Sequence, residues 1–199
     1  LIRRQRQMCI RDREDTMQTL NQDIKERSFR PVYLLYGEET FLVNSYKNRL
    51  KEAVLGDDTM NFSRYEGKGI DVGELIRQAD TMPFFAEKRL ILVEDSGFFK
   101  ASSEELASYL PSMPDTTCII FAESQVDKRN RLYKKVKELG YAAEMQRQDA
   151  AQLARWAGGI LAREERKITG RTMELFLSMT GEDTVSYTHL RAHETSAHL

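Results

Sequence analysis

The turn after the first apolar run of the chain is where nucleotide chemistry would be expected. Residues 32–36 read as a buried strand that stops at Gly37, and residues 40–54 carry apolar side chains at helical spacing. A P-loop at such a turn needs glycines whose backbone N–H groups surround phosphate, then a lysine and a serine or threonine. This turn has a single glycine and no such lysine, and Glu38 and Glu39 would repel phosphate. It predicts a strand end and a helix start, without ATP binding.

A second candidate site is the acidic end of another apolar run. Residues 90–93 are followed by Glu94 and Asp95, an order that resembles a Walker-B strand whose acids hold magnesium. Without a P-loop the pattern has a simpler interpretation, because acidic residues commonly close a buried strand where the chain returns to water. We therefore interpret both acids as structural, and we expect no metal and no cofactor.

Histidine catalysis is excluded from the central part of the chain. The three histidines (His189, His193 and His198) all lie within residues 184–199, which break off a helical pattern without a cap. Residues 1–16 begin with an arginine-rich stretch that has no usable periodicity, and both ends resemble translated sequencing adapters. We expect residues 1–16 to be non-native or disordered and residues 184–199 to be a non-native tail. The rest then offers no Ser-His or Cys-His pair and few ligands for zinc.

Charge and cysteine content exclude further classes of protein. Without residues 1–13 and 184–199 the chain has 24 Lys and Arg against 29 Asp and Glu, a net charge of −5, which does not indicate a generally basic nucleic-acid binder. Cys118 lies in an apolar run and Cys9 near the N-terminus, so no disulfide framework is predicted. No apolar run approaches the length of a membrane span, and no signal-peptide pattern is present. A cytoplasmic location is the default.

An aromatic pair stands on the loop that leads into residues 90–93. Phe84 and Phe85 directly follow Pro83, and a charged triplet separates them from the strand. Loops lie at the surface, where an exposed aromatic pair is unfavourable unless something covers it. By local rules alone one ring is expected to pack inward, with binding of a partner protein as the alternative.

A basic segment, residues 128–137, reads as a helix with two interpretations. Leu132, Tyr133 and Val136 would face inward and leave the lysines and arginines on a solvated face. Alternatively, the charged face would contact phosphates or an acidic partner. The solvated face is the favoured interpretation, and contact with DNA stays open.

Strands and helices alternate from residue 32 onward. The expected strands are residues 32–36, 61–66, 90–93, 117–121 and 141–145, and the expected helices are residues 40–54, 72–80, 103–110 (closed by Pro111) and 128–139. Four of the five strands are almost continuously apolar, which is typical of a parallel sheet covered on both faces. The pattern predicts a doubly wound α/β domain over residues 17–146. Residues 149–166 and 169–179 then read as helices, so a small helical domain is expected to begin within residues 147–183.

Three segments together resemble the delta subunit of bacterial DNA polymerase III. They are residues 31–39 with Phe41 and Leu42, the loop 81–89 with its following strand, and residues 121–129 with 132–134. The resemblance extends over residues 17–183. It implies a parallel sheet of the AAA+/RecA-like kind that lacks a P-loop and does not bind ATP. A helical lid domain would follow, and the family's C-terminal collar would be missing from this chain.

The resemblance also implies a function. Delta is a clamp-loader subunit of the replicative polymerase III holoenzyme, which binds the β sliding clamp and helps open it for loading on primed DNA. The implied clamp-binding residues are Met82, Phe84 and Phe85, and the implied partners are the clamp, the gamma/tau and delta-prime subunits and primed DNA, with no membrane. The family forms part of a DNA-directed DNA polymerase, a nucleotidyltransferase, but no catalytic activity is expected in this chain. The alternatives are a divergent P-loop-like ATPase and a generic α/β protein-interaction module.

Overall fold

The structure is a computed structural model that describes residues 17–146, 158 and 169–172 of the 199-residue chain. The chain divides into two compact units, Leu1–Met145 and Gln146–Leu199, and the fold below is that of the first. The expected non-native ends lie outside the described residues. So do the expected helices 149–166 and 169–179, apart from residues 158 and 169–172.

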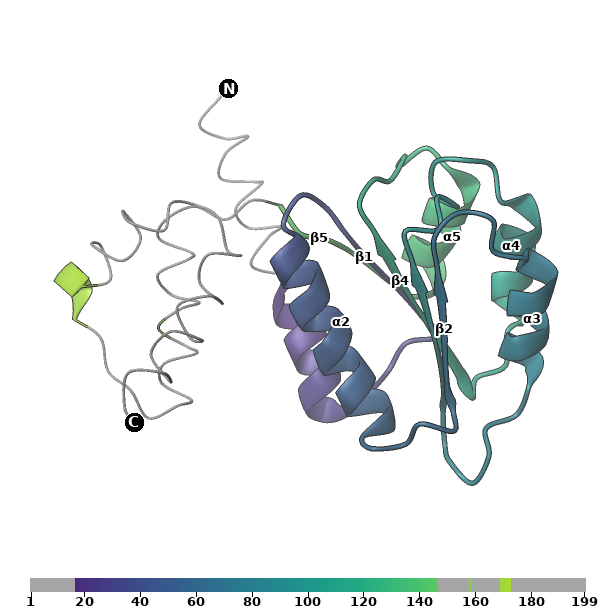
Figure 1. Ribbon diagram of the computed structural model, residues 1–199, viewed down its shortest axis with the longest axis horizontal. Coiled ribbons are helices and arrows are strands. Elements are labelled where there is room, and N and C mark those ends of the chain that lie inside the picture. Colours follow the sequence, from purple (N-terminus) through teal and green to yellow (C-terminus); the bar gives the residue numbers. More distant parts are fainter. Residues whose placement is uncertain (1–16, 147–157, 159–168, 173–199) are drawn as a thin grey trace, which may run out of the picture. The chain divides into compact units, whose positions relative to one another are not determined.

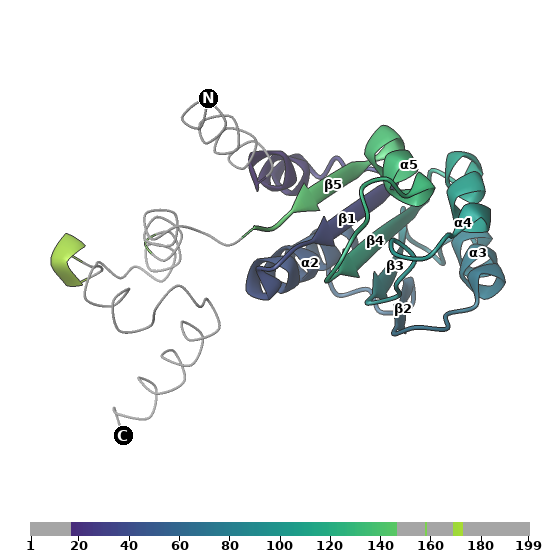
Figure 2. The same cartoon turned by 90° about the horizontal axis from the view of Figure 1, so that it is seen from above.

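The first unit is built on a sheet of five parallel strands (Figure 2). In chain order these are β1 (Val32–Tyr36), β2 (Phe62–Glu66), β3 (Arg89–Glu94), β4 (Thr117–Glu123) and β5 (Tyr141–Glu144). Their order across the sheet is β2-β3-β4-β1-β5. Every residue of β1, β3 and β4 is buried, as continuously apolar strands require when helices cover both faces. The predicted parallel α/β fold is confirmed.

Three helices cover one face of the sheet (Figure 1): α3 (Val72–Asp80), α4 (Glu104–Tyr109) and α5 (Arg131–Leu139). Because side chains alternate along a strand, the first, third and fifth residues of β1 point to this face. They form one apolar cluster with alternate residues of β3 and β4 and with the inner sides of the three helices. Phe99 and Phe121 meet edge to face within it, their ring centroids 5.2 Å apart.

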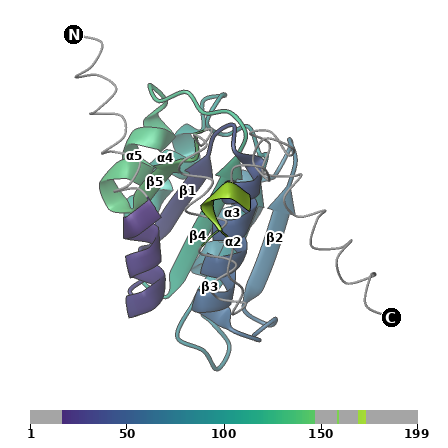
Figure 3. The same cartoon turned by 90° about the vertical axis from the view of Figure 1, so that its left-hand side faces the viewer.

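The opposite face is covered by α2 (Thr40–Leu55) and by a helical segment at residues 17–26 (Figures 1 and 3). Asn21 joins the two helices, since it donates to the Tyr46 hydroxyl at 3.2 Å and accepts from Arg49 at 2.8 Å. Below them the hydroxyl of the fully buried Tyr33 donates to Asp23 at 2.9 Å. The helix at residues 17–26 was not predicted from the sequence.

The remaining elements differ from the predictions mainly at their ends. The predicted start of the basic helix at Lys128 is wrong: α5 begins at Arg131, because the Asn130 side chain caps it by accepting from the Leu132 N–H at 2.8 Å. Pro111 also does not simply close the preceding helix. It lies inside a short 3-10 turn, η1 (Leu110–Ser112), that continues from α4.

The close approach of α5 to the sheet generates a stability prediction. A Cβ atom added at Gly140 would lie 1.8 Å from the carbonyl oxygen of Val32, a backbone atom of a central strand. We expect Gly140→Ala to lower the free energy of unfolding of the 199-residue chain by about 3 kcal/mol, because overpacking here must move a strand. Chemical denaturation followed by circular dichroism measures this.

Gly73→Ala is the matched control, because the atoms nearest to an added Cβ at Gly73 belong to the side chains of Asp71 and Arg77, at 3.3 and 3.4 Å, which can move. Gly73 lies in the first turn of α3, so alanine there should change the free energy of unfolding by less than about 1 kcal/mol. Equal losses in the two variants would contradict the proposed clash.

Candidate protein-binding surface

The aromatic pair lies on the loop that joins α3 to β3, at the amino ends of the parallel strands. Met82 is 78% exposed, Phe84 55% and Phe85 95%. The expectation that one ring packs inward is therefore wrong. Phe85 is almost fully exposed and Phe84 more than half exposed, because both helix layers lie on the faces of the sheet and the loop projects beyond its end.

The two rings pack against each other instead of against the core. Their centroids are 4.5 Å apart and their planes meet at 81°, the edge-to-face arrangement that aromatic pairs favour. Phe85 has φ of 48°, which is uncommon for a bulky residue and is usually maintained by surrounding contacts. The loop thus presents a defined pair of rings in a conformation that local preferences alone would not select.

Asn61 supplies the contacts that hold this conformation. Its side chain is fully buried just before β2, where Nδ2 donates to the Phe84 carbonyl at 2.8 Å and Oδ1 accepts from the Phe84 N–H at 2.6 Å. Nδ2 also donates to Asp58 at 2.6 Å, and this bond is the main reason that the pKa of Asp58 lies below its usual value. Neither Asn61 nor Asp58 was predicted from the sequence as part of this site, because no local motif marks them.

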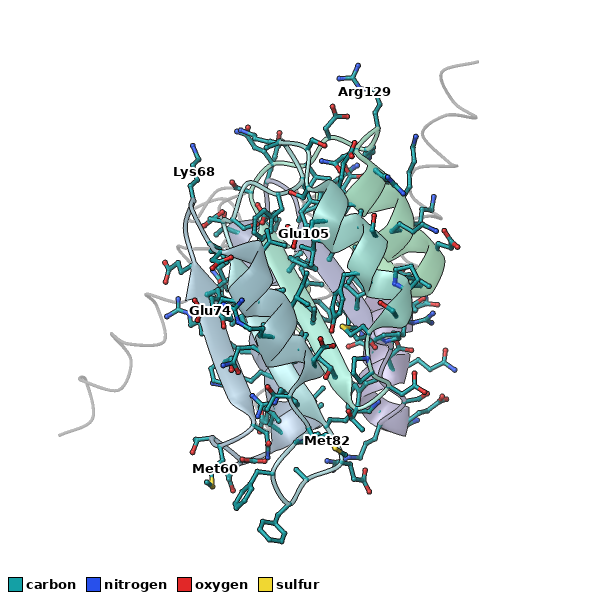
Figure 4. All side chains as sticks on the ribbon, turned by 90° about the vertical axis from the view of Figure 1, so that its right-hand side faces the viewer. Met60, Lys68, Glu74, Met82, Glu105 and Arg129 are labelled. Atoms are coloured by element: carbon teal, nitrogen blue, oxygen red, sulfur yellow. The ribbon has the colours of Figure 1, made fainter. Side chains whose placement is uncertain are left out.

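Met60 extends the apolar surface from a second loop. It is 68% exposed and precedes Asn61 directly. Figure 4 shows Met60 and Met82 at one end of the molecule, opposite Lys68 and Arg129. Among the residues that the structure describes, the large hydrophobic side chains that are exposed are Met60, Met82, Phe84 and Phe85. We call these four residues the apolar tip.

The turn after β1, where a P-loop would hold phosphate, lies at the opposite, carboxyl end of the sheet. There the backbone of Met145 fills the space beside the turn: its carbonyl accepts from the Glu39 N–H at 3.1 Å, and its N–H donates to the Tyr36 carbonyl at 2.6 Å. Gly37 has φ of 132°, and a Cβ there would lie 2.2 Å from the same Met145 carbonyl. The close approach of the Met145 backbone therefore explains why a glycine stands at position 37.

The acid in the Walker-B-like position is paired with two cations. Glu94 accepts from Lys47 of α2 and from Arg64 of β2, each at 2.5 Å. Burial alone would raise the pKa of Glu94, but these two hydrogen-bonded cations outweigh burial and hold the pKa below its usual value. The carboxylate is thus ionised and already neutralised by side chains of the protein.

Within the residues that the structure describes, no group of three or more His, Cys, Asp or Glu could hold a metal ion. No helix within the same residues is long and apolar enough to cross a membrane.

Two sequence comparisons find similarity to one family of proteins. Residues 33–146 match the family model of the DNA polymerase III delta subunit. The curated DNA polymerase III subunit delta of Bacillus subtilis is 28% identical over 160 residues, which cover 74% of this chain and 46% of that protein. The chain therefore spans about half the length of this relative.

Solved structures support the fold. A Bacillus subtilis DNA clamp loader delta protein aligns with a TM-score of 0.71 and 23% identity, over 84% of this chain and 53% of that one. A DNA polymerase III gamma subunit-related protein from Thermotoga maritima aligns with a TM-score of 0.50 and 16% identity, over 75% of this chain and 52% of its own. Because the family model covers more than half of the sequence, the chain belongs to the DNA polymerase III delta subunit family.

Proposed function

We propose that this chain binds the β sliding clamp through the apolar tip and helps open the clamp ring for loading on primed DNA. The observation that carries the proposal is the position of the exposed large hydrophobic side chains, which lie on two loops at one end of the described sheet. A Bacillus subtilis structure of the same fold is named a DNA clamp loader delta protein, which supports the assignment.

The tip has the chemistry of an interface centre. Buried aromatic side chains are among the commonest hot spots of protein interfaces, and a phenylalanine buries on the order of 150–250 Å² when it enters a pocket. Phe85 is 95% exposed, so nearly all of its side chain is free for a partner to cover. Met82 and Met60 add flexible thioethers, which adapt to the shape of an apolar pocket.

The proposed action is mechanical. A subunit that binds the open form of a ring more tightly than the closed form shifts the equilibrium toward opening by that difference in affinity. The chain needs no chemistry of its own for this role. In the assembled loader its partners would be the gamma/tau and delta-prime subunits and the primed DNA on which the ring is placed.

We further infer that the chain does not bind ATP. Met145 packs into the turn where phosphate would be held, and Lys47 and Arg64 neutralise Glu94. A magnesium-bound phosphate would have to displace both sets of contacts. These observations favour the non-enzymatic clamp-binding role over a divergent ATPase. A generic protein-interaction module would bind a partner other than the clamp, so the measurement of clamp binding separates it from the proposed role.

The first prediction concerns the aromatic pair. Phe84→Ala combined with Phe85→Ala should weaken binding of the 199-residue chain to a purified bacterial β sliding clamp by about 2 kcal/mol or more, as hot-spot aromatics do. Surface plasmon resonance measures the affinity. The melting temperature should be unchanged, because both rings are exposed.

Phe121→Ala is the contrasting variant, since Phe121 is fully buried in the core. It should lose on the order of 3–5 kcal/mol of stability, as buried phenylalanines do when truncated. A double-alanine variant that binds the clamp as the wild type does, or that unfolds like the Phe121 variant, would contradict the proposed site.

A second prediction tests the extension of the surface to Met60. Met60→Ala should weaken clamp binding by about fivefold, less than the double phenylalanine variant, because one shortened side chain removes less apolar contact. Lys68→Ala, at the opposite end of the molecule, should leave the affinity unchanged (Figure 4). Equal affinities for the Met60 variant and the wild type would confine the site to the loop between α3 and β3.

A third prediction addresses nucleotide. Isothermal titration of the 199-residue chain with ATP and Mg²⁺ should give no binding heat, under conditions in which a P-loop ATPase is saturated. Saturable, magnesium-dependent binding would show that the Met145 backbone can leave the turn, and would return the ATPase alternative to first place.

A further inference from the structure

We propose that Asn61 is a positioning residue of the clamp-binding loop, which sets the Phe84–Phe85 pair in its binding conformation before the clamp arrives. The inference rests on the proposed function, and it adds a residue that does not touch the partner. Asn61 is fully buried, whereas the rings it would control are exposed.

The contact between Asn61 and the loop resembles the pairing of one strand with another. The side-chain amide donates to the Phe84 carbonyl at 2.8 Å and accepts from the Phe84 N–H at 2.6 Å. An asparagine side chain carries a donor and an acceptor side by side on one planar group. Both backbone groups of Phe84 are therefore fixed by one side chain.

Asp58 determines which way the amide points. Its carboxylate accepts from Asn61 Nδ2 at 2.6 Å, and its other oxygen accepts from the Met60 N–H at 2.8 Å and the Asn61 N–H at 3.3 Å. An ionised carboxylate only accepts, so Nδ2 must face Asp58 and the Phe84 carbonyl, and Oδ1 must face the Phe84 N–H. The three residues form one consistent network.

The network is itself attached to the sheet. The Asn61 carbonyl accepts from the Leu90 N–H at 2.9 Å, which joins the residue before β2 to the start of β3. Among the described residues, the two bonds to Phe84 are the hydrogen bonds that tie residues 82–87 to the rest of the protein. Asn61 thus connects an exposed loop to a rigid strand edge.

This attachment matters because of the conformation that it holds. Phe85 adopts a positive φ, which the loop would leave readily if Phe84 were free. A loop that must be ordered on binding loses affinity for the ordering, and one that is already ordered does not. Asn61 would therefore act on affinity through the free state of the protein, without a contact to the clamp.

The test compares Asn61→Ala with Asn130→Ala in the 199-residue chain. Asn130 also makes three side-chain hydrogen bonds to a loop and a helix start, at 3.1, 2.9 and 2.8 Å, but at the carboxyl end of the sheet. The two substitutions remove the same chemistry at opposite ends. Three quantities are measured: the melting temperature, the amide hydrogen exchange of Phe84 in the free chain, and the affinity for a purified β sliding clamp.

We expect both variants to lower the melting temperature to a similar extent. Asn61→Ala alone should speed exchange of the Phe84 amide, whose acceptor it removes, and weaken clamp binding, each by about tenfold. Asn130→Ala should leave exchange of the Phe84 amide and clamp affinity within about twofold of the wild type. If Asn61→Ala does not fold, Asp58→Ala replaces it, with about threefold effects in the same directions, because it removes the group that orients the amide and leaves the Asn61 side chain in place.

Unchanged exchange and unchanged affinity in a folded Asn61 variant would overturn the inference while the clamp-binding proposal stands. Loss of affinity without faster exchange would also overturn it, since Asn61 would then act by some route other than loop order. If the wild-type chain does not bind the clamp, the proposed function fails. Exchange of the Phe84 amide still decides whether Asn61 orders the loop for another partner.

Discussion

Burial of three central strands on both faces is the constraint on which the rest of this structure depends. Strands β1, β3 and β4 have no exposed residue, so helices must cover both faces of the sheet. The loops that join strands to helices then lie at the two ends of the sheet. The exposed loops available to a ligand or partner therefore lie at the carboxyl ends or at the amino ends of the strands. The apolar tip occupies the amino ends, and its loop leads directly into β3, one of the most buried strands.

The apolar tip lies at the opposite end of the sheet from the ligand site of an ordinary parallel α/β domain. Ligands of open parallel sheets bind in crevices outside the carboxyl ends of the strands. Here the backbone of Met145 fills one such place, and the Lys47–Glu94–Arg64 cluster neutralises the acid at another. These contacts stabilise the carboxyl end as structure. The exposed apolar residues at the amino end, in contrast, are not explained by the stability of the fold.

The sequence was most informative where one element determines its own structure. Continuous apolar runs predicted the buried strands to within two residues at either end. It was least informative where distant segments meet. Asn61 and Phe84 are 23 residues apart and come together because β2 pairs with β3 in parallel, which no local pattern encodes. The inward ring was wrongly expected for the same reason, since ring burial depends on whether a helix layer reaches the end of the sheet.

The apolar tip combines features that do not stabilise the fold on its own. Largely exposed rings add little to folding stability, and a phenylalanine at positive φ costs on the order of 1–3 kcal/mol. A buried amide must have its hydrogen bonds satisfied, and Asn61 spends its own on a loop that covers no core. A fold optimised only for stability would replace these residues with a short polar turn. An ordered and strained apolar pair makes physical sense when a partner covers it, because binding then gains from rings whose conformation is already fixed.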